Sequence, residues 1–185
     1  MVVSLLNLQL GRNFSMASPA NPDFYKITWR DVESNVNAIQ QKLDQMRWYP
    51  EFVIGVARGG LLPATMLSHR LKVPVSIISM ATYDADETKK TNMAGAEGIL
   101  YNPIDGSKMM WDEISCINLD TALLVDDICD TGETLEAISK HLPLVRIATL
   151  FQKIDPNARV PFSVPNWIHR GQVVPHYKWA VFPWE

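Results

Sequence analysis

Three aspartates, two hydroxyl residues and a glycine lie close together in the stretch "ALLVDDICDTGETL", residues 122–135. Two of the acids, Asp126 and Asp127, follow an apolar run directly, and like charges side by side repel each other. Such a pair is useful when a divalent cation or the vicinal hydroxyls of a sugar share it. The pair therefore indicates a site for Mg²⁺, for a polyhydroxyl ligand such as ribose, or for both.

The residues after the acid pair are suited to a phosphate group. Small residues at a strand-to-helix turn expose backbone N–H groups, and the helix N-terminus adds a positive end. An ordinary N-cap at Thr131 is the commoner use of such a residue, but Gly132 and a second hydroxyl favour phosphate. The stretch contains neither GxxxxGK[ST] nor GxGxxG. With the acids four residues away, it predicts a ribose 5-phosphate site.

The elements that must position these residues alternate between strands and helices. The spacing of apolar residues predicts helices over 29–46, 61–71 and 131–142, the first after a capping box from Thr28 to Asp31. Short apolar runs predict strands over 52–57, 73–81, 121–127 and 144–151. This alternation is typical of an α/β fold with a parallel sheet. Ligands of such sheets bind where the strands end, and both "ARGG" and "DDICDTGET" follow predicted strands.

Composition limits the classes of protein that fit. The chain has 185 residues, 47% hydrophobic and 20% charged, with a net charge of −3, which is typical of one globular domain. A dedicated nucleic-acid partner is disfavoured because no basic excess is present, and no apolar stretch is long enough for a membrane span. Cys116 and Cys129 form no metal motif and fit reduced core residues of a cytoplasmic protein.

Two segments stand outside the alternating pattern. Residues 83–113 are polar, contain glycines and are too long for an ordinary connection, which favours a mobile lid. Residues 1–22 contain no acid and only one arginine, Arg12, and fit neither a signal peptide nor a transit peptide. We therefore expect residues 1–22 to be a loosely ordered extension.

The stretch "LLVDDICDTGET" resembles the motif with which type I phosphoribosyltransferases bind 5-phosphoribosyl 1-pyrophosphate (PRPP). Other segments resemble the purine branch of that family, most closely its xanthine-guanine group: "YKITWRDVESNV", "IGVARGGLLPATMLSHRL", "TYDADETKK", "LFQK" and "KWAVFPWE". The resemblance runs from about Tyr25 to Glu185. It implies a type I phosphoribosyltransferase-like α/β fold in one domain, residues 23–185. A flexible lid would cover 83–113, and a base-binding hood about 153–185.

The resemblance also implies roles for single residues. The residues that would bind pyrophosphate are Arg58, Gly59, Gly60 and Lys89, with a strained or cis peptide before Arg58. The ribose hydroxyls and the cofactor Mg²⁺ would be bound by Asp126 and Asp127. The 5-phosphate would be bound by Thr131, Gly132, Glu133 and Thr134. Asp130 would lie beside purine N7 as the general base. The purine itself would be held by Lys153, Trp179, Ala180 and Glu185.

The hypothesis from these residues is a purine salvage enzyme. It would convert guanine, xanthine or hypoxanthine and PRPP to the nucleoside 5'-monophosphate and pyrophosphate. A lysine at position 153 suits a 6-oxopurine because it only donates hydrogen bonds. The alternatives are a PRPP- or nucleotide-sensing regulator on the same fold and a transferase that acts on a pyrimidine. The family resemblance implies a homodimer or homotetramer.

Overall fold

The computed structural model describes residues 23–80, 98–102, 105–110, 118–154 and 166–185. Its first helix, α1 (Trp29–Met46), begins with the predicted capping box. The Thr28 hydroxyl accepts a hydrogen bond from the Asp31 amide at 3.2 Å, and the Asp31 carboxylate accepts one from the Thr28 amide at 2.9 Å. The apolar face of α1 is buried at Val32, Val36, Ile39 and Leu43. The helix prediction is therefore confirmed.

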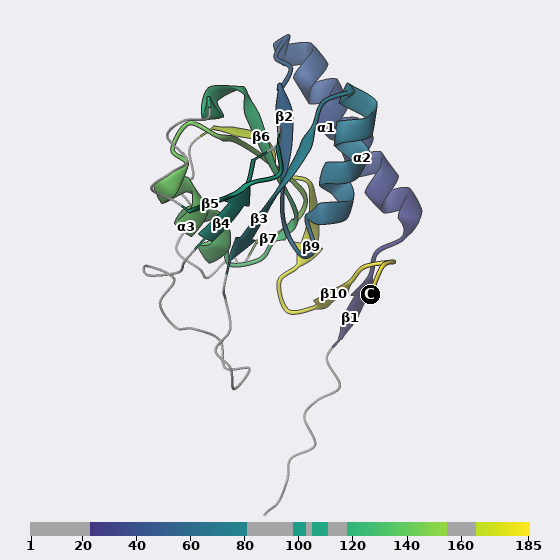
Figure 1. The fold of residues 1–185 in the computed structure, drawn as a ribbon. Coiled ribbons are helices and arrows are strands. Elements are labelled where there is room, and N and C mark those ends of the chain that lie inside the picture. Colours follow the sequence, from purple (N-terminus) through teal and green to yellow (C-terminus); the bar gives the residue numbers. More distant parts are fainter. Residues whose placement is uncertain (1–22, 81–97, 103–104, 111–117, 155–165) are drawn as a thin grey trace, which may run out of the picture.

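A sheet of eight strands forms the centre of the molecule (Figure 1). Four parallel strands are its core: β2 (Phe52–Ala57), β3 (Val75–Met80), β6 (Ala122–Cys129) and β7 (Arg146–Ile154). The strand order is β5-β4-β3-β2-β6-β7-β8, and β9 also pairs with β7. A short 3-10 helix, Leu119–Thr121, leads into β6. The predicted parallel α/β sheet is confirmed at its core.

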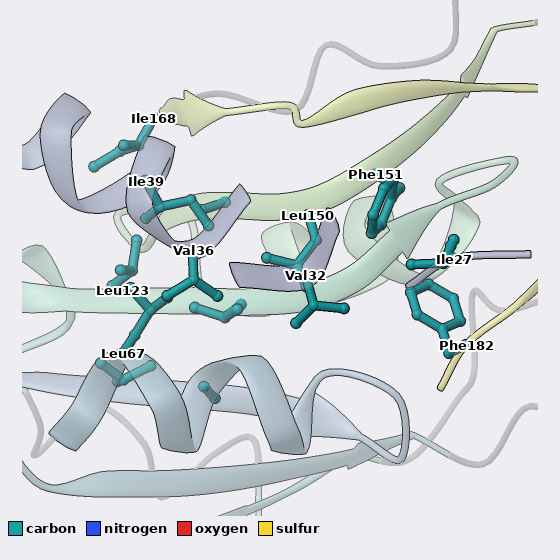
Figure 2. Close-up of a cluster of buried hydrophobic side chains, with 14 of the residues drawn as sticks. Ile27, Val32, Val36, Ile39, Leu67, Leu123, Leu150, Phe151, Ile168 and Phe182 are labelled. Atoms are coloured by element: carbon teal, nitrogen blue, oxygen red, sulfur yellow. The ribbon is translucent and has the colours of Figure 1, made fainter. Parts of the chain in front are cut away.

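Helices cover both faces of this sheet. The helices α1 and α2 (Leu61–Leu71) lie on one face, and α3 (Glu133–His141) lies on the other (Figure 1). The face of α1 and α2 holds a buried cluster that includes Ile39, Leu67, Leu123 and Leu150 (Figure 2). The strands are apolar on both faces because both faces are covered.

The segment 83–113 is more regular than we predicted. It contains two short antiparallel strands, β4 (Gly98–Tyr101) and β5 (Lys108–Met110), which continue the sheet from β3. The prediction of one long loop is wrong for these residues. Strands of three or four residues beside glycine and proline leave little periodicity in a sequence. Residues 81–97, the centre of the predicted lid, lie outside the described residues.

The carboxy-terminal hood is smaller than we predicted. The strands β8 (Trp167–His169) and β9 (Gln172–Pro175) pair with β7 and so belong to the main sheet. Only β10 (Trp179–Val181) leaves it and pairs in parallel with β1 (Phe24–Lys26). The hood in the described part of the chain is thus a two-stranded sheet made by the two chain ends (Figure 1).

Several element bounds differ from prediction near the site. Strand β6 continues past the acid pair to Cys129, and β7 continues to Ile154. Strand β3 begins after Pro74, which has no amide to donate. Helix α3 begins at Glu133 because Gly132 adopts a left-handed conformation.

Within the described ranges, no helix is long and apolar enough to cross a membrane.

Candidate active site

Two neighbouring strands bring the predicted phosphate-binding loops together. Strands β2 and β6 are parallel and pair Gly55 with Val125, so the residues that follow lie at the same edge of the sheet. Arg58 is exposed at the end of β2 and follows a cis peptide bond from Ala57, as predicted. Gly60 is the N-cap of α2, and its amide donates to the Val56 carbonyl at 2.9 Å.

Gly59 lies directly against the carboxylate of Asp127. A Cβ atom built on Gly59 would be 2.0 Å from Asp127 Oδ2, a distance that no pair of nonbonded atoms tolerates. Any side chain at position 59 would therefore displace this carboxylate. The loop after β2 therefore lies against the acid pair, and we call these residues, together with the start of α3, the phosphate end of the site. It includes Arg58, Gly59, Gly60, Asp126, Asp127, Thr131, Gly132 and Thr134.

The two acids are poorly compensated within the described part of the chain. Asp126 is only 8% exposed, and burial together with the charge of Asp127 raises its pKa well above the usual value. Burial raises the pKa of Asp127 to about 6, and the negative charge of Glu185 adds to this. Each carboxylate accepts one backbone hydrogen bond, from the Asp127 amide at 3.0 Å and from the Ile128 amide at 2.7 Å. A cation or hydroxyl donors would favour the charged form of the pair.

The acid pair fits Mg²⁺ better than a metal caged by the protein alone. In the ranges that the structure describes, no three His, Cys, Asp or Glu residues cluster as a metal site. Mg²⁺ commonly binds one or two carboxylates and takes its other oxygen ligands from water and substrate phosphates. Two adjacent carboxylates beside a phosphate-binding loop match that pattern.

The turn from Asp130 to Thr134 leaves the start of α3 without a side-chain cap. Gly132 is the N-cap, with φ of 77°, and no side chain makes a capping hydrogen bond there. The commoner reading of Thr131 as the helix cap is therefore wrong. Thr131 is exposed and Thr134 is partly buried, so both hydroxyls lie at the helix N-terminus. This geometry suits an anion, since backbone N–H groups and the helix dipole both face outward.

The base end of the site consists of Asp130, Lys153 and Trp179, whereas Glu185, which was predicted to belong to it, bonds to Phe182 and acts on the pKa of Asp127. The Lys153 Nζ atom lies 2.7 Å from Asp130 Oδ2 and 5.8 Å from the centre of the Trp179 ring. The lysine side chain is only 9% exposed, whereas that of Asp130 is 53% exposed. The structure thus brings together a donor, an acceptor and an aromatic face, which are the groups needed to hold a planar heterocycle.

The last residues of the chain form a compact turn behind the base end. The Glu185 side chain accepts a hydrogen bond from the Phe182 amide at 3.2 Å, and the Glu185 amide donates to the Phe182 carbonyl at 3.2 Å. Trp184 stacks on Phe182 with ring centres 4.7 Å apart and contacts Trp29 at 6.0 Å. Ala180, predicted beside the purine, is buried in the hood. The Glu185 side chain is therefore already partly engaged by its own turn.

Sequence reasoning missed Ile128 and the position of Glu185. Ile128 is partly buried between the acid pair and Asp130, and it packs against the same cluster as Trp184. Its only sequence signal was an apolar residue inside an otherwise polar motif. Glu185 lies near enough to Asp127 to raise the pKa of that carboxylate, a contact between distant segments that no motif encodes.

Two further predictions have different outcomes. Cys129 is a buried free cysteine, and burial raises the pKa of its thiol to about 12, which fits a core residue. Lys89 lies outside the described residues, as does Cys116. The role of Lys89 on pyrophosphate stays a prediction.

The sequence matches one protein family over most of its length. Residues 28–179 match the family described as "Phosphoribosyl transferase domain". The chain is 25% identical over 162 residues to the xanthine-guanine phosphoribosyltransferase of Desulfotalea psychrophila, covering 87% of this chain and 86% of the relative. It is 27% identical to the protein of the same name from Cereibacter sphaeroides, covering 87% and 86%.

Solved structures agree with this relationship. The purine phosphoribosyltransferase from Pyrococcus horikoshii has a TM-score of 0.59 and 31% identity, covering 88% of this chain and 95% of its own. A Neisseria gonorrhoeae protein with bound ppGpp has a TM-score of 0.62 at 23% identity, covering 89% and 90%, and shows the same fold. The chain therefore belongs to the phosphoribosyl transferase domain family, as an enzyme of the pentosyltransferase class with purine phosphoribosyltransferases among its relatives.

Proposed function

We propose that this enzyme transfers the 5-phosphoribosyl group of PRPP to N9 of a 6-oxopurine, releasing pyrophosphate. The substrates would be guanine, hypoxanthine or xanthine. The observation that carries the proposal is the joining of the two ends of the site. Asp130 belongs to the turn that starts the phosphate-binding helix, and its carboxylate also pairs with Lys153 beneath Trp179. A base and a sugar phosphate held in this way would meet at one place.

At the phosphate end, each group has a role in holding PRPP. Arg58 and the backbone amides of Gly59 and Gly60 would bind the pyrophosphate, while Asp126 and Asp127 accept hydrogen bonds from the ribose hydroxyls. The start of α3 would bind the 5-phosphate. The two carboxylates would also hold Mg²⁺, which would supply positive charge to offset the negative charge of the leaving group.

At the base end, the bond to N9 forms as the bond from C1 to pyrophosphate breaks. Departure of pyrophosphate leaves positive charge on the sugar, which the nearby carboxylates stabilise. The purine loses the proton on N7 to the Asp130 carboxylate, which acts as a general base. Lys153 donates to the 6-oxo group and can keep its contact with Asp130, since an ammonium has three donors. Trp179 stacks on the ring.

The preference among the three oxopurines depends on what faces position 2 of the ring. Guanine has an amino donor there, xanthine an oxo acceptor and hypoxanthine neither. Carbonyls near Trp184 and the Glu185 carboxylate would accept from the amino group of guanine and repel the oxo group of xanthine. We therefore expect guanine to be used well. Curated relatives carry the name xanthine-guanine phosphoribosyltransferase, which supports the inclusion of xanthine in the test.

The test is a nucleotide-formation assay with PRPP, Mg²⁺ and a panel of guanine, xanthine, hypoxanthine, adenine, uracil and orotate. The expected result is Mg²⁺-dependent turnover of at least one 6-oxopurine. Turnover of adenine or a pyrimidine alone would show that the base assignment is wrong.

A second function, sensing of PRPP or a nucleotide, would use the same fold without turnover. The Neisseria gonorrhoeae protein with bound ppGpp has this fold. PRPP binding by this chain without turnover of any base in the panel would favour that role.

A further inference from the structure

One face of the hood carries two aromatic rings that the described part of the chain leaves about half exposed, and the Lys153 ammonium lies 5.8 Å from the centre of one of them, Trp179. Paired residues of neighbouring parallel strands point to the same face of a sheet, and the register pairs Phe24 with Trp179 and Tyr25 with Ala180. Tyr25 and Ala180 pack against the buried cluster of the main domain. Phe24 and Trp179 point the other way and are 47% and 59% exposed. We call this the hood face.

Phe24 and Trp179 are paired across the two strands, so their half-exposed rings lie next to each other on the hood face. Apolar surface in water is unfavourable, and a contiguous exposed patch of it usually marks an interaction site. Tyr177, two residues before Trp179, is exposed as well. A stacked purine would cover Trp179 only while substrate is bound, and it gives no reason for an apolar residue at position 24.

Asp23, the residue that follows 1–22 in the chain, lies at the edge of this face. The Asp23 carbonyl accepts a hydrogen bond from the Trp179 amide at 2.9 Å. The Asp23 carboxylate forms an ion pair with Lys178 Nζ at 3.2 Å. Position 22 is therefore joined to a residue that two contacts hold beside Trp179.

The composition of residues 1–22 suits an apolar surface. The segment contains no Asp or Glu, and its first ten residues include Val2, Val3, Leu5, Leu6, Leu8 and Leu10. Its four leucines lie 13 to 18 positions before Asp23. A chain of that length can span at most roughly 45–60 Å when extended. Two paired strands are only about 5 Å apart, so the leucines can reach the hood face.

We propose that residues 1–22 dock on the hood face through their leucines and compete with the purine for the ring of Trp179. The docking stands apart from the proposed function, whereas the competition rests on it. A tethered segment has an effective concentration in the millimolar range. If its own dissociation constant is also millimolar, it occupies the face for half of the time or more. The apparent affinity for a purine nucleotide then falls about two- to five-fold.

The experiment uses the full chain labelled with 5-fluorotryptophan and its ¹⁹F NMR spectrum. The Trp179 signal is the one missing from Trp179→Phe, and the Trp48 signal is assigned in the same way. The matched variant keeps the length of the segment and replaces Leu5, Leu6, Leu8 and Leu10 by serine. Trp48 lies under Arg146, 4.4 Å from its guanidinium carbon, and serves as the control.

Docking predicts that the Trp179 signal of the substrate-free protein moves between the wild type and the serine variant, while the Trp48 signal stays. An unchanged Trp179 signal would overturn the proposal. A shift that grows with protein concentration would overturn it too, because the segment would then act between copies.

Calorimetric titration with GMP tests the competition. The serine variant should bind GMP about two- to five-fold more tightly than the wild type. Equal affinities would overturn the competition. If the Trp179 signal moves but neither protein binds GMP, the proposed function fails and the docking stands.

Discussion

At the phosphate end of the candidate site, the groups proposed to bind ligand are mainly buried acids and backbone from two neighbouring strands. At the base end they are side chains from three segments that are far apart in the sequence, and Asp130 and Trp179 are more than half exposed. We expect the first arrangement to be rigid, because a Cβ atom at position 59 would have no room beside the Asp127 carboxylate. The second depends on how the hood lies against β7.

This difference has a chemical reason within the proposed function. PRPP carries its charges at fixed positions, so backbone amides and paired carboxylates in a rigid frame can match them. A base is planar and nearly neutral, and a stacking ring with one donor and one acceptor is enough to select it. Substitutions at the two ends should therefore change different kinetic constants.

The largest effect is expected for Asp130→Asn. A positioned general base contributes about 10²–10⁴-fold to rate, so kcat should fall by that factor while PRPP affinity stays nearly the same. Asp126→Ala is the matched acid at the phosphate end and should instead impair the use of PRPP. The measurement is kcat and KM for both substrates, with PRPP affinity from calorimetry. Equal losses of PRPP affinity in the two variants would remove the distinction between the ends.

The ion pair sharpens this prediction. Lys153 is nearly buried, and Asp130→Asn leaves its charge without the partner that lies at 2.7 Å. An uncompensated buried charge is destabilising. The double variant Asp130→Asn with Lys153→Met should therefore be more stable to denaturant than Asp130→Asn alone, although it remains slow. A double variant that is less stable would show that the pair contributes little.

The second effect is expected for Gly59→Ala. The added methyl group would lie 2.0 Å from Asp127 Oδ2 and must displace that carboxylate. A misplacement of about 1 Å at a catalytic site can cost about 10²-fold, so kcat/KM for PRPP should fall by about that factor. Thr65→Ala, at an exposed position on α2, is the control. A Gly59→Ala enzyme with normal PRPP kinetics would mean that the phosphate end is not rigid.

The same difference explains how far the sequence could predict the structure. The phosphate end is encoded by two contiguous motifs, and the acids, the loop after β2 and the cis peptide before Arg58 were all predicted from them. Each motif carries its own strand, turn and helix, so local pattern and local geometry agree. The contact between Gly59 and Asp127 was missed, because it depends on the register of two strands.

The residues of the base end were predicted one by one, but the arrangement in which the structure brings Asp130, Lys153 and Trp179 together was not. Lys153 and Trp179 were found through the family resemblance, yet their pairing with Asp130 depends on β7 running on to Ile154. The short strands β4, β5, β8 and β9 were not predicted, because three or four residues carry too little periodicity. The turn that engages Glu185 was missed for a different reason: its hydrogen bond to Phe182 accompanies the stacking of Phe182 and Trp184, and no sequence pattern encodes either contact.

A smaller effect is expected when Trp184 and Glu185 are deleted. The deletion removes the ring that stacks on Phe182 and the carboxylate that accepts from the Phe182 amide. The ratios of kcat/KM among guanine, hypoxanthine and xanthine should change by about ten-fold, within the range for loss of a hydrogen-bonding partner or of packing. Glu185→Gln is the matched variant, because it keeps an acceptor oxygen and loses the charge. Unchanged ratios after the deletion would mean that other residues of the hood recognise the substituent at position 2 of the purine.

The smallest effect concerns stability and pH. Burial raises the pKa of Asp127 to about 6 in the folded protein, whereas an exposed aspartate has a pKa of about 3.9. The folded state therefore binds this proton more tightly than the unfolded chain does. The contribution of the group to stability is fully present below about pH 4 and is lost as the pH rises through about 6.

At pH 7 the substrate-free protein thus bears the cost of an ionised, partly buried Asp127. We expect Asp127→Asn to be more stable than the wild type by about 1–3 kcal/mol at pH 7, at about 1.4 kcal/mol per pKa unit, and to lose this advantage near pH 4. Urea denaturation at both pH values measures the difference, with Glu33→Gln on the exposed face of α1 as the control.

PRPP with Mg²⁺ should make the wild type more stable than Asp127→Asn at pH 7, because both ligands need the charged carboxylate that the variant lacks. A variant that is less stable than the wild type at pH 7 without ligand would mean that the acid pair is compensated by the protein itself. The phosphate end would then be a structural feature as much as a binding site.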